Sequence, residues 1–375
     1  MDKIRKLILI RVNFDNSKGR KEYMILNDQQ TSVNTVFYEL PVHHNAALTS
    51  AEVAELWNTY MHYSMLSCIF THFEAQAKDP EIRSFMKEAL ERCQVRAKIS
   101  SDLLKGDNQP IPVGFSAEDV NVNAPPLYAD NYLLHYLRHM LRFSFTLNSF
   151  NINLLSRPDV RDFYIKVLES SLRLKIKVDD LALAKGILPR PPITTMSKEV
   201  EFVHNPSFLA GFSGEKRPLL AMEIAHLYYN ALSNQMARIL LLGFKQVSPT
   251  QDVRDYFAEG IKITDKFFDK LSAYANKEDI FFNFLNDGDL TDSTEPPFSD
   301  KLMMFHINSL SLAGIGMYGV SMGASQRHDV AAAYAKMMLE TGQYAEKGAK
   351  LAMEKEWLEE PPQVVDRDKL SGMKH

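Results

Sequence analysis

The sequence has little cysteine and no excess of charge of one sign. It contains two cysteines, Cys68 and Cys93, in 375 residues, which excludes a disulfide framework and a four-cysteine zinc site. Lysine plus arginine total 43 and aspartate plus glutamate 47, giving a net charge of −4. A broad basic face for a nucleic acid is therefore not expected. The low cysteine content fits a cytoplasmic protein.

A secretory leader is not expected from this sequence. The apolar run at residues 7–10 is too short for the core of a signal peptide. Residues 1–45 fit poorly with the rest of the chain, so we interpret them as an N-terminal extension that is disordered or results from a mis-chosen start. Met24 is a possible alternative start.

One uncharged segment is long enough to cross a bilayer. Residues 302–326 contain no Asp, Glu, Lys or Arg. They do contain His306, Asn308 and several serines, which are too polar for a membrane span. We therefore expect a buried central helix here and keep membrane association as a weaker alternative.

The chain repeats itself at a separation of about 170 residues. Four pairs of strings match in the same order: IRSFM (82–86) with VRDYF (253–257), PPLYAD (125–130) with PPFSD (296–300), RPDV (157–160) with RHDV (327–330), and PP (191–192) with PP (361–362). We infer a tandem duplication of residues 46–190 and 220–362. Residues 191–219 form the linker and residues 363–375 a tail.

Each unit is expected to contain four helices. The first helix, at about 50–77, carries apolar residues at the spacing of one helical face. Short connections between helices one and two, and between three and four, predict antiparallel neighbours. We expect Asp130 and Asp300 to cap the third helices. The long stretches 107–126 and 276–297 are crossovers, so the predicted fold is all-α: two ferritin-like four-helix bundles in tandem.

Several motifs resemble one known family. They are LTSAEVAELW (48–57), IPVGF (111–115), EDVNVNAP (118–125), DSTEPPFSDKLMMF (292–305), QYAE (343–346) and WLEEPP (357–362). They resemble the two-repeat family catalogued as domain of unknown function 3231. The likeness covers residues 46–369. It implies a ferritin-like bundle from spore-forming Gram-positive bacteria, similar to spore coat F-like proteins, and brings no catalytic residues with it.

Metal chemistry has weak support in the sequence. A di-iron bundle needs Glu-x-x-His on two helices, and the two such strings, at 201–204 and 223–226, lie in the linker and near the start of a first helix. His135 and His139 share a helix face, with Asp130 about one turn away. These three are the metal candidates, although we expect an interface or surface pair. Cys68 and Cys93 are expected to be buried thiols.

Gly314, Gly316, Gly319 and Gly323 fall in one predicted helix. The string at 314–319 matches G-x-G-x-x-G, but no strand precedes it, so a dinucleotide site is not expected. Glycines are costly in helix interiors, so we expect them at a close helix approach, within the bundle, between bundles or with another chain. No cofactor is predicted.

The sequence thus predicts a non-catalytic structural or interaction protein with protein partners or self-association, and the resemblance implies an association with sporulation. The alternative is a binding protein or enzyme that uses a pocket within or between the bundles. Buried polar groups converging on a cavity, such as Gln235, His306 and Asn308, would favour that alternative.

Overall fold

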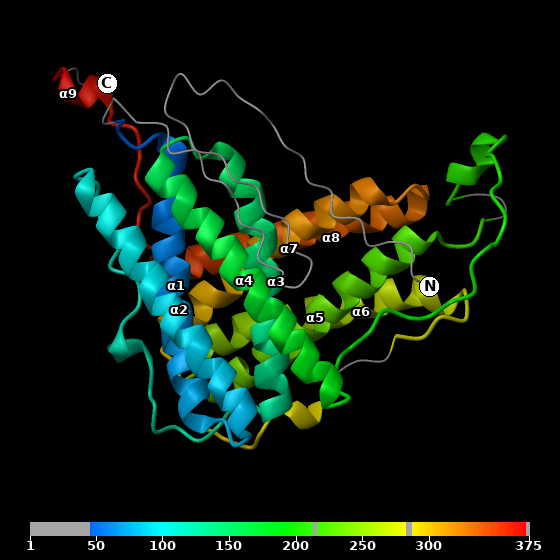
Figure 1. Ribbon diagram of the computed structural model, residues 1–375, viewed down its shortest axis with the longest axis horizontal. Helices are drawn as coiled ribbons and strands as arrows, with labels where there is room; N and C mark the ends of the chain where they lie inside the picture. Colours follow the sequence, from blue (N-terminus) through cyan, green and yellow to red (C-terminus); the bar gives the residue numbers. More distant parts are fainter. Residues whose placement is uncertain (1–45, 213–215, 283–286, 373–375) are drawn as a thin grey trace, which may run out of the picture. The chain divides into compact units, whose positions relative to one another are not determined.

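The computed structural model describes residues 46–212, 216–282 and 287–372, and the regular structure of these residues is helical (Figure 1). The long helices are α1 (Ser50–Gln76), α2 (Pro80–Gly106), α3 (Asp130–Asn151), α4 (Pro158–Ala184), α5 (Ala221–Val247), α6 (Gln251–Asn276), α7 (Asp300–Ala324) and α8 (His328–Glu354). The short helices are η2 (Ala117–Asp119), η3 (Ile152–Leu154), η4 (Pro206–Leu209), η5 (Asp287–Asp289) and α9 (Arg367–Leu370). The predicted all-α class is confirmed. The predictions for residues 1–45, Met24 included, lie outside the described residues.

The first two helices begin at strong sequence signals. The Thr49 hydroxyl accepts the backbone N–H of Glu52 at 3.2 Å, and the Glu52 carboxylate accepts the N–H of Thr49 at 2.8 Å. This reciprocal pair is a capping box. The Asp79 carboxylate accepts two N–H groups in the first turn of α2, which Pro80 opens.

Asp130 and Asp300 do not cap the third helices, so that prediction was wrong. The Asp130 carboxylate accepts the backbone N–H groups of residues 78 and 79, in the turn between α1 and α2. Asp300 accepts a hydrogen bond of 2.7 Å from the Ser248 hydroxyl, in the turn between α5 and α6. The cap of α7 is Ser299. Each aspartate therefore fastens the start of helix three to a neighbouring turn, whose polar groups lack helical partners.

Each repeat consists of two helix pairs: α1 packs along α2, α3 along α4, α5 along α6 and α7 along α8 (Figure 1). A first crossover (107–129) and a second crossover (277–299) join the pairs within each repeat. The predicted tandem duplication is confirmed, and the likeness to ferritin stays a prediction. The repeats differ in one respect. Whereas α5 packs closely on α7, the equivalent helices α1 and α3 approach each other less closely.

The two crossovers pair with each other reciprocally. Val120 forms an antiparallel bridge with Phe298, and Tyr128 forms one with Leu290. Val120 and Leu290 hold equivalent positions in the two repeats, as do Tyr128 and Phe298. Exchanging the repeats therefore turns one bridge into the other, which is the rule for a two-fold interface. The protein is built like a symmetric dimer fused into one chain.

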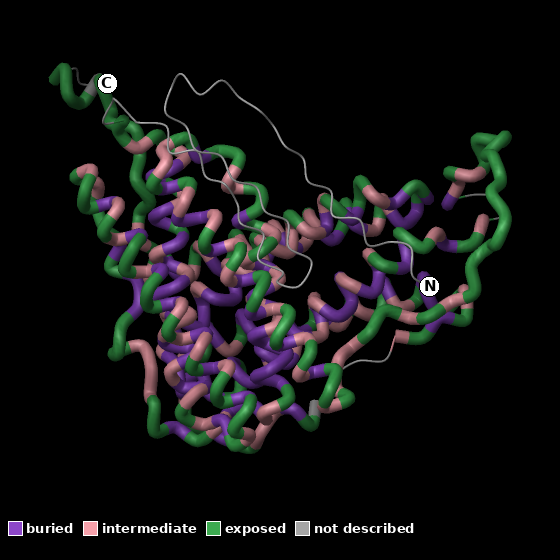
Figure 2. The backbone as a smooth tube through the Cα atoms, viewed as in Figure 1, coloured by how far each residue is buried: buried purple, intermediate pink, exposed green. Residues whose placement is uncertain are grey.

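One apolar core runs through both repeats. It includes side chains from α1, α2, α3 and α4 together with α5, α6 and α7, and Leu48 onward forms one compact unit. Tyr128 and Tyr132 cross between the repeats and donate hydrogen bonds to the carbonyls of Leu240 and Met236, at 2.8 and 3.1 Å. Figure 2 shows the buried residues on the facing sides of the helices, while the linker is mostly exposed.

Candidate functional site

A cavity of about 280 Å³ lies between α1, α3 and α7, where the two repeats meet. We call it the α1–α3–α7 cavity. Its apolar lining is Met65, Leu66, Met140, Phe143, Leu147, Leu310 and Ala313. Its polar lining is Glu55, Asn58, Thr59, His62, Tyr63, Ser144, Asn148, Asn151, His306 and Ser309. Polar residues are the more numerous, but most of the wall surface is apolar. Apolar walls with placed polar groups are typical of sites for small organic molecules.

One face of α1 forms the length of the cavity. Glu55, Thr59, His62 and Leu66 follow one another at intervals of three or four residues, so they share a helix face. At 1.5 Å per residue, the distance along α1 from Glu55 to Leu66 is about 16 Å. The cavity is therefore elongated, with Glu55 towards one end and His62 towards the other.

His306 is the most deeply buried polar residue of this lining, with 1% of its surface exposed. Its Nε2 atom lies 3.0 Å from the Tyr136 hydroxyl. Its Nδ1 atom is buried and has no hydrogen-bond partner among the described residues. An unpartnered buried polar atom is costly, by about 1–3 kcal/mol. A polar group of a ligand, or a water molecule, in the cavity would satisfy this nitrogen.

Both histidines of the cavity are neutral near pH 7. Burial, with a smaller contribution from His62, lowers the pKa of His306 to about 3. Burial also lowers the pKa of His62, against the hydrogen bond that its Nδ1 donates to the Asn58 carbonyl at 2.7 Å. Since Nδ1 of His62 carries the proton, its Nε2 is an acceptor. This end of the cavity is uncharged and able to form hydrogen bonds.

The hydroxyl groups of the cavity are held by the first repeat itself. Thr59 and Tyr164 share a hydrogen bond of 2.6 Å. Arg96 donates to the Tyr63 hydroxyl at 3.1 Å, and that hydroxyl lies 3.2 Å from Ser144 Oγ. These contacts fix the side chains in place, so the wall is preformed.

The second repeat has a smaller cavity that overlaps the equivalent place and also extends between α6 and α8. Its volume is about 80 Å³, and His139, Phe143, Ser233 and Tyr318 are among its lining residues. Tyr318 stands where the first repeat has Asn148, and Phe143 takes the place that Ala313 has in the larger cavity. Larger, aromatic side chains therefore stand at two of the equivalent positions in the smaller cavity. The fold alone does not impose a large cavity.

The smaller cavity has one histidine, and it does not stand at the position equivalent to His62. His139 stands at the equivalent of Ser309, and Ser233 at the equivalent of His62. Arg142 donates to His139 Nδ1 at 2.8 Å and to the Ser233 hydroxyl at 2.8 Å, which closes this wall.

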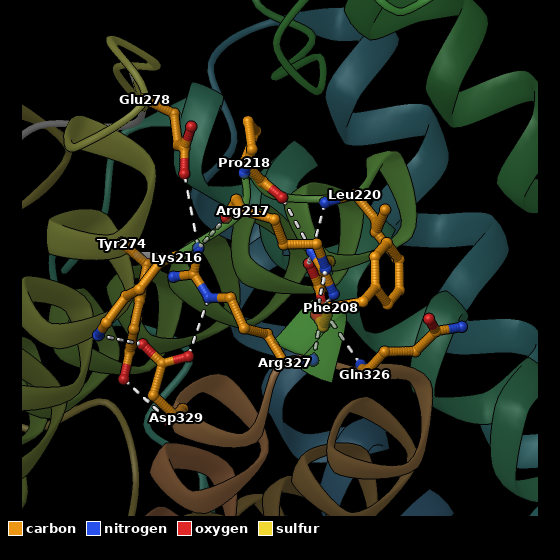
Figure 3. A network of polar contacts seen from close by, with 11 residues as sticks. Phe208, Lys216, Arg217, Pro218, Leu220, Tyr274, Glu278, Gln326, Arg327 and Asp329 are labelled. Carbon is orange, nitrogen blue, oxygen red and sulfur yellow. Dashed lines mark hydrogen bonds and ion pairs between the residues drawn. The ribbon is translucent and has the colours of Figure 1, made fainter. Parts of the chain in front are cut away.

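A separate cluster of buried charge lies at the start of α5 (Figure 3). The Glu223 carboxylate is fully buried and accepts hydrogen bonds from both terminal nitrogens of Arg217, at 2.8 and 2.9 Å. It also accepts the backbone N–H of Arg327, whose side chain pairs with Asp329 at 2.9 Å. Acids and bases compensate each other within the cluster, so we interpret it as structural.

In the described part of the chain, the three metal candidates are not grouped as the ligands of one ion. His135 and His139 are both buried, His139 Nδ1 is occupied by Arg142, and both Asp130 oxygens accept backbone N–H groups. Glu201 and His204 are exposed in the linker. In the described part of the chain, no three His, Cys, Asp or Glu side chains are grouped so that they could hold a metal ion.

The α7 glycines are less crowded than expected. A Cβ atom added at Gly316 or Gly323 would meet nothing within 4 Å, and at Gly319 the nearest atom is Met338 Cε at 3.6 Å. The close approach predicted for these positions is therefore absent within the described residues. At Gly314 the nearest atom belongs to Tyr318, at 3.9 Å. Contact with another chain stays a prediction.

The sequence named one residue of the cavity correctly and missed others. His306 lines the cavity, whereas Asn308 accepts a hydrogen bond from the Tyr256 hydroxyl at 2.8 Å and Gln235 lines neither cavity. Glu55 and His62 were not recognised. Their spacing places them on one face of α1, but nothing local shows that α7 of the other repeat lies opposite.

The architecture is that of a two-repeat, all-α protein with a pseudo-symmetric core. The chain belongs to the family described as "Protein of unknown function (DUF3231)", whose model matches residues 38–200 and 207–370. This confirms the predicted family. No curated protein matches the chain.

A solved structure from Bacillus halodurans, described as a putative spore coat protein, is similar to part of the chain. The identity is 18%, and the match covers 40% of this chain and 98% of that one, with a TM-score of 0.36. Separately, no helix among the described residues is long and apolar enough to cross a membrane. Residues 302–326 instead fall largely within α7.

Proposed function

We propose that this protein binds a small organic molecule in the α1–α3–α7 cavity and does not transform it. The observation that carries this proposal is the volume of this cavity, about 280 Å³. At two equivalent positions the smaller cavity has the aromatic side chains of Phe143 and Tyr318 instead. An engineered apolar cavity of about 150 Å³ is large enough for benzene. The larger space here is adequate for a one- or two-ring molecule.

The surroundings of the histidines and cysteines that could act in catalysis support binding rather than catalysis. Neither His62 nor His306 is hydrogen-bonded to a carboxylate among the described residues. Such a partner commonly orients a catalytic histidine. Burial also raises the pKa of the Cys68 and Cys93 thiols to about 12, so neither is a ready nucleophile.

The experiment is titration with a neutral fluorescent naphthalene probe, using wild-type protein, Ala313→Leu and Ala332→Leu. Ala313 lines the cavity, whereas Ala332 is exposed on α8. We expect one probe per wild-type chain, at least about tenfold weaker binding to Ala313→Leu because its side chain occupies the cavity, and unchanged binding to Ala332→Leu. Equal binding to all three proteins would refute the proposal.

A second candidate role, self-association, is favoured by the linker. Val200, Phe202 and Phe212 are 91%, 81% and 74% exposed, which is unusual for large apolar side chains. We propose that a second copy of the chain covers them. The expected result is a dimer by light scattering that dissociates in Phe202→Ser/Phe212→Ser, and a monomeric wild type would contradict it.

The setting that we propose is the cytoplasm of sporulating cells. This proposal rests on the sequence resemblance, and its test is the timing of protein accumulation relative to spore formation. Accumulation confined to vegetative growth would oppose it.

A further inference from the structure

The charge around the α1–α3–α7 cavity is of one sign. Among the described residues, Glu55 is the only carboxylate in the lining, and no lysine or arginine is present there. Burial lowers the pKa of both of its histidines, so they are neutral near pH 7. The cavity therefore offers a ligand one site of negative charge and none of positive charge.

Glu55 lacks a cationic partner. The side-chain amide of Asn151 donates to one of its carboxylate oxygens. No lysine or arginine pairs with Glu55 in the described part of the chain, although most other half-buried acids here have such a partner, as Asp179 has in Arg138 at 2.6 Å. Burial raises the pKa of Glu55, against the hydrogen bond from Asn151. A cation beside this carboxylate would offset the cost of its burial.

The opposite end of the cavity is suited to a neutral polar atom. His306 Nδ1 has no partner among the described residues, and His62 Nε2 is free to accept since its Nδ1 is the protonated nitrogen. Between the two ends, Met140, Phe143 and Leu310 supply apolar wall.

We propose that the ligand of this cavity is an amine with an aromatic or alicyclic body, its ammonium group beside Glu55 and its far end towards His306 and His62. The inference rests on the proposed ligand-binding function and specifies its chemistry. A carboxylate or phosphate ligand would meet Glu55 with no cation to offset it. A metal cation would find a single carboxylate, too few hard ligands to hold it.

The test compares three probes of one shape: 1-naphthylmethylamine, 1-naphthalenemethanol and 1-naphthoic acid, measured by calorimetry at pH 7 with the full chain. We expect the amine to bind about tenfold more tightly than the alcohol, because its ammonium group adds a charge–charge attraction to the hydrogen bond that either probe donates to the Glu55 carboxylate. The acid should bind most weakly.

The variant is Glu55→Gln, which keeps the shape of the side chain and removes its charge. It should bring the amine to within about twofold of the alcohol, because the amine loses much more affinity than the alcohol does. Glu74→Gln, a substitution further along α1 and outside the cavity lining, should leave the preference intact.

The outcomes separate the two proposals. If the alcohol binds the wild type as tightly as the amine, or if Glu55→Gln keeps the amine preference, the assignment of an amine is overturned while the ligand-binding function stands. If none of the three probes binds the wild type, the proposed function itself fails.

Discussion

Tyr136 and His306 hold equivalent positions in the two repeats and are hydrogen-bonded to each other, with Tyr136 Oη 3.0 Å from His306 Nε2. In a two-fold arrangement, a residue meets its own counterpart only close to the axis. This pair therefore marks where the pseudo-symmetry axis passes through the core. In a homodimer the two residues would be identical, whereas the fused chain places a hydroxyl against an imidazole nitrogen.

The burial of histidine predicts that the fold loses stability in mild acid. Burial lowers the pKa of His72 and His135 to about 4 and that of His306 to about 3. An unfolded histidine titrates near 6.5, so below that pH the unfolded chain binds more protons than the folded one. The free energy of unfolding should therefore fall as the pH drops from about 7 to 5, by up to about 1.4 kcal/mol per pH unit for each such histidine.

Urea unfolding at several pH values measures this slope. His306→Gln should reduce the slope of the unfolding free energy against pH by up to about 1.4 kcal/mol per pH unit, the contribution of one proton, because the amide does not titrate. His328→Gln is the control, since His328 is exposed, and should keep the wild-type slope. An unchanged slope in His306→Gln would show that His306 is not the buried neutral group described above.

Two glycines should respond to alanine in opposite directions. A Cβ atom at Gly243 would lie 2.6 Å from Tyr128 Cζ, and Tyr128 is held by its hydrogen bond to the Leu240 carbonyl. Gly243→Ala should cost about 1–3 kcal/mol of stability through this overlap. Gly316→Ala meets open space and should gain up to about 1 kcal/mol from helix propensity. Chemical denaturation measures both.

A double-mutant cycle tests the cause of the first effect. In a Tyr128→Leu background, Gly243→Ala should cost much less, because the ring that blocks the Cβ atom is gone. Additive effects of the two substitutions would mean that the clash is not the source of the loss.

Glu52 and Glu223 hold equivalent places in the two repeats, where each joins the first helix to the turn before the fourth. We expect them to contribute unequally to the free energy of unfolding. Glu52 accepts the backbone N–H groups of Ser156 and Arg157 at 2.9 and 2.7 Å. Burial alone would raise the pKa of Glu52, but its backbone hydrogen bonds prevail and lower it to about 2. Glu223 makes the equivalent bonds and also neutralises Arg217.

Glu52→Gln should therefore destabilise the protein by about 2–3 kcal/mol through weaker hydrogen bonds. Glu223→Gln should cost more, about 3–5 kcal/mol, because it leaves Arg217 without its carboxylate. Thermal unfolding of both variants gives the comparison, with exposed Glu354→Gln as the control. The reverse order would mean that the ion pair adds nothing to the backbone contacts.

The helices could be predicted from the sequence because their signals are local. The first helix, expected at 50–77, is Ser50–Gln76, where apolar spacing and a capping box define it. The repeat predicted the tandem fold, since matching strings recur in order. The caps at Asp130 and Asp300 failed because each carboxylate binds a turn that is distant in sequence.

The cavity could not be predicted in the same way. It depends on the distance between α1 and α3 and on the position of α7 from the other repeat. No local sequence pattern encodes either of these. His306 was noticed as a polar residue in an uncharged helix. The role proposed for Glu55 depends on the absence of a cation from the described cavity lining, which only the folded structure reveals.

The buried cysteines provide a test of the non-catalytic interpretation. Burial, reinforced for Cys68 by the negative charge of Asp119, raises the pKa of both thiols to about 12. At pH 8 only about one thiol in ten thousand is then a thiolate, the form that reacts with iodoacetamide. The folded protein should stay unmodified while glutathione in the same tube reacts, and in urea both cysteines should be alkylated, as intact-mass measurement would show. Rapid alkylation of one cysteine in the folded chain would identify an activated thiol and return a nucleophilic mechanism to consideration.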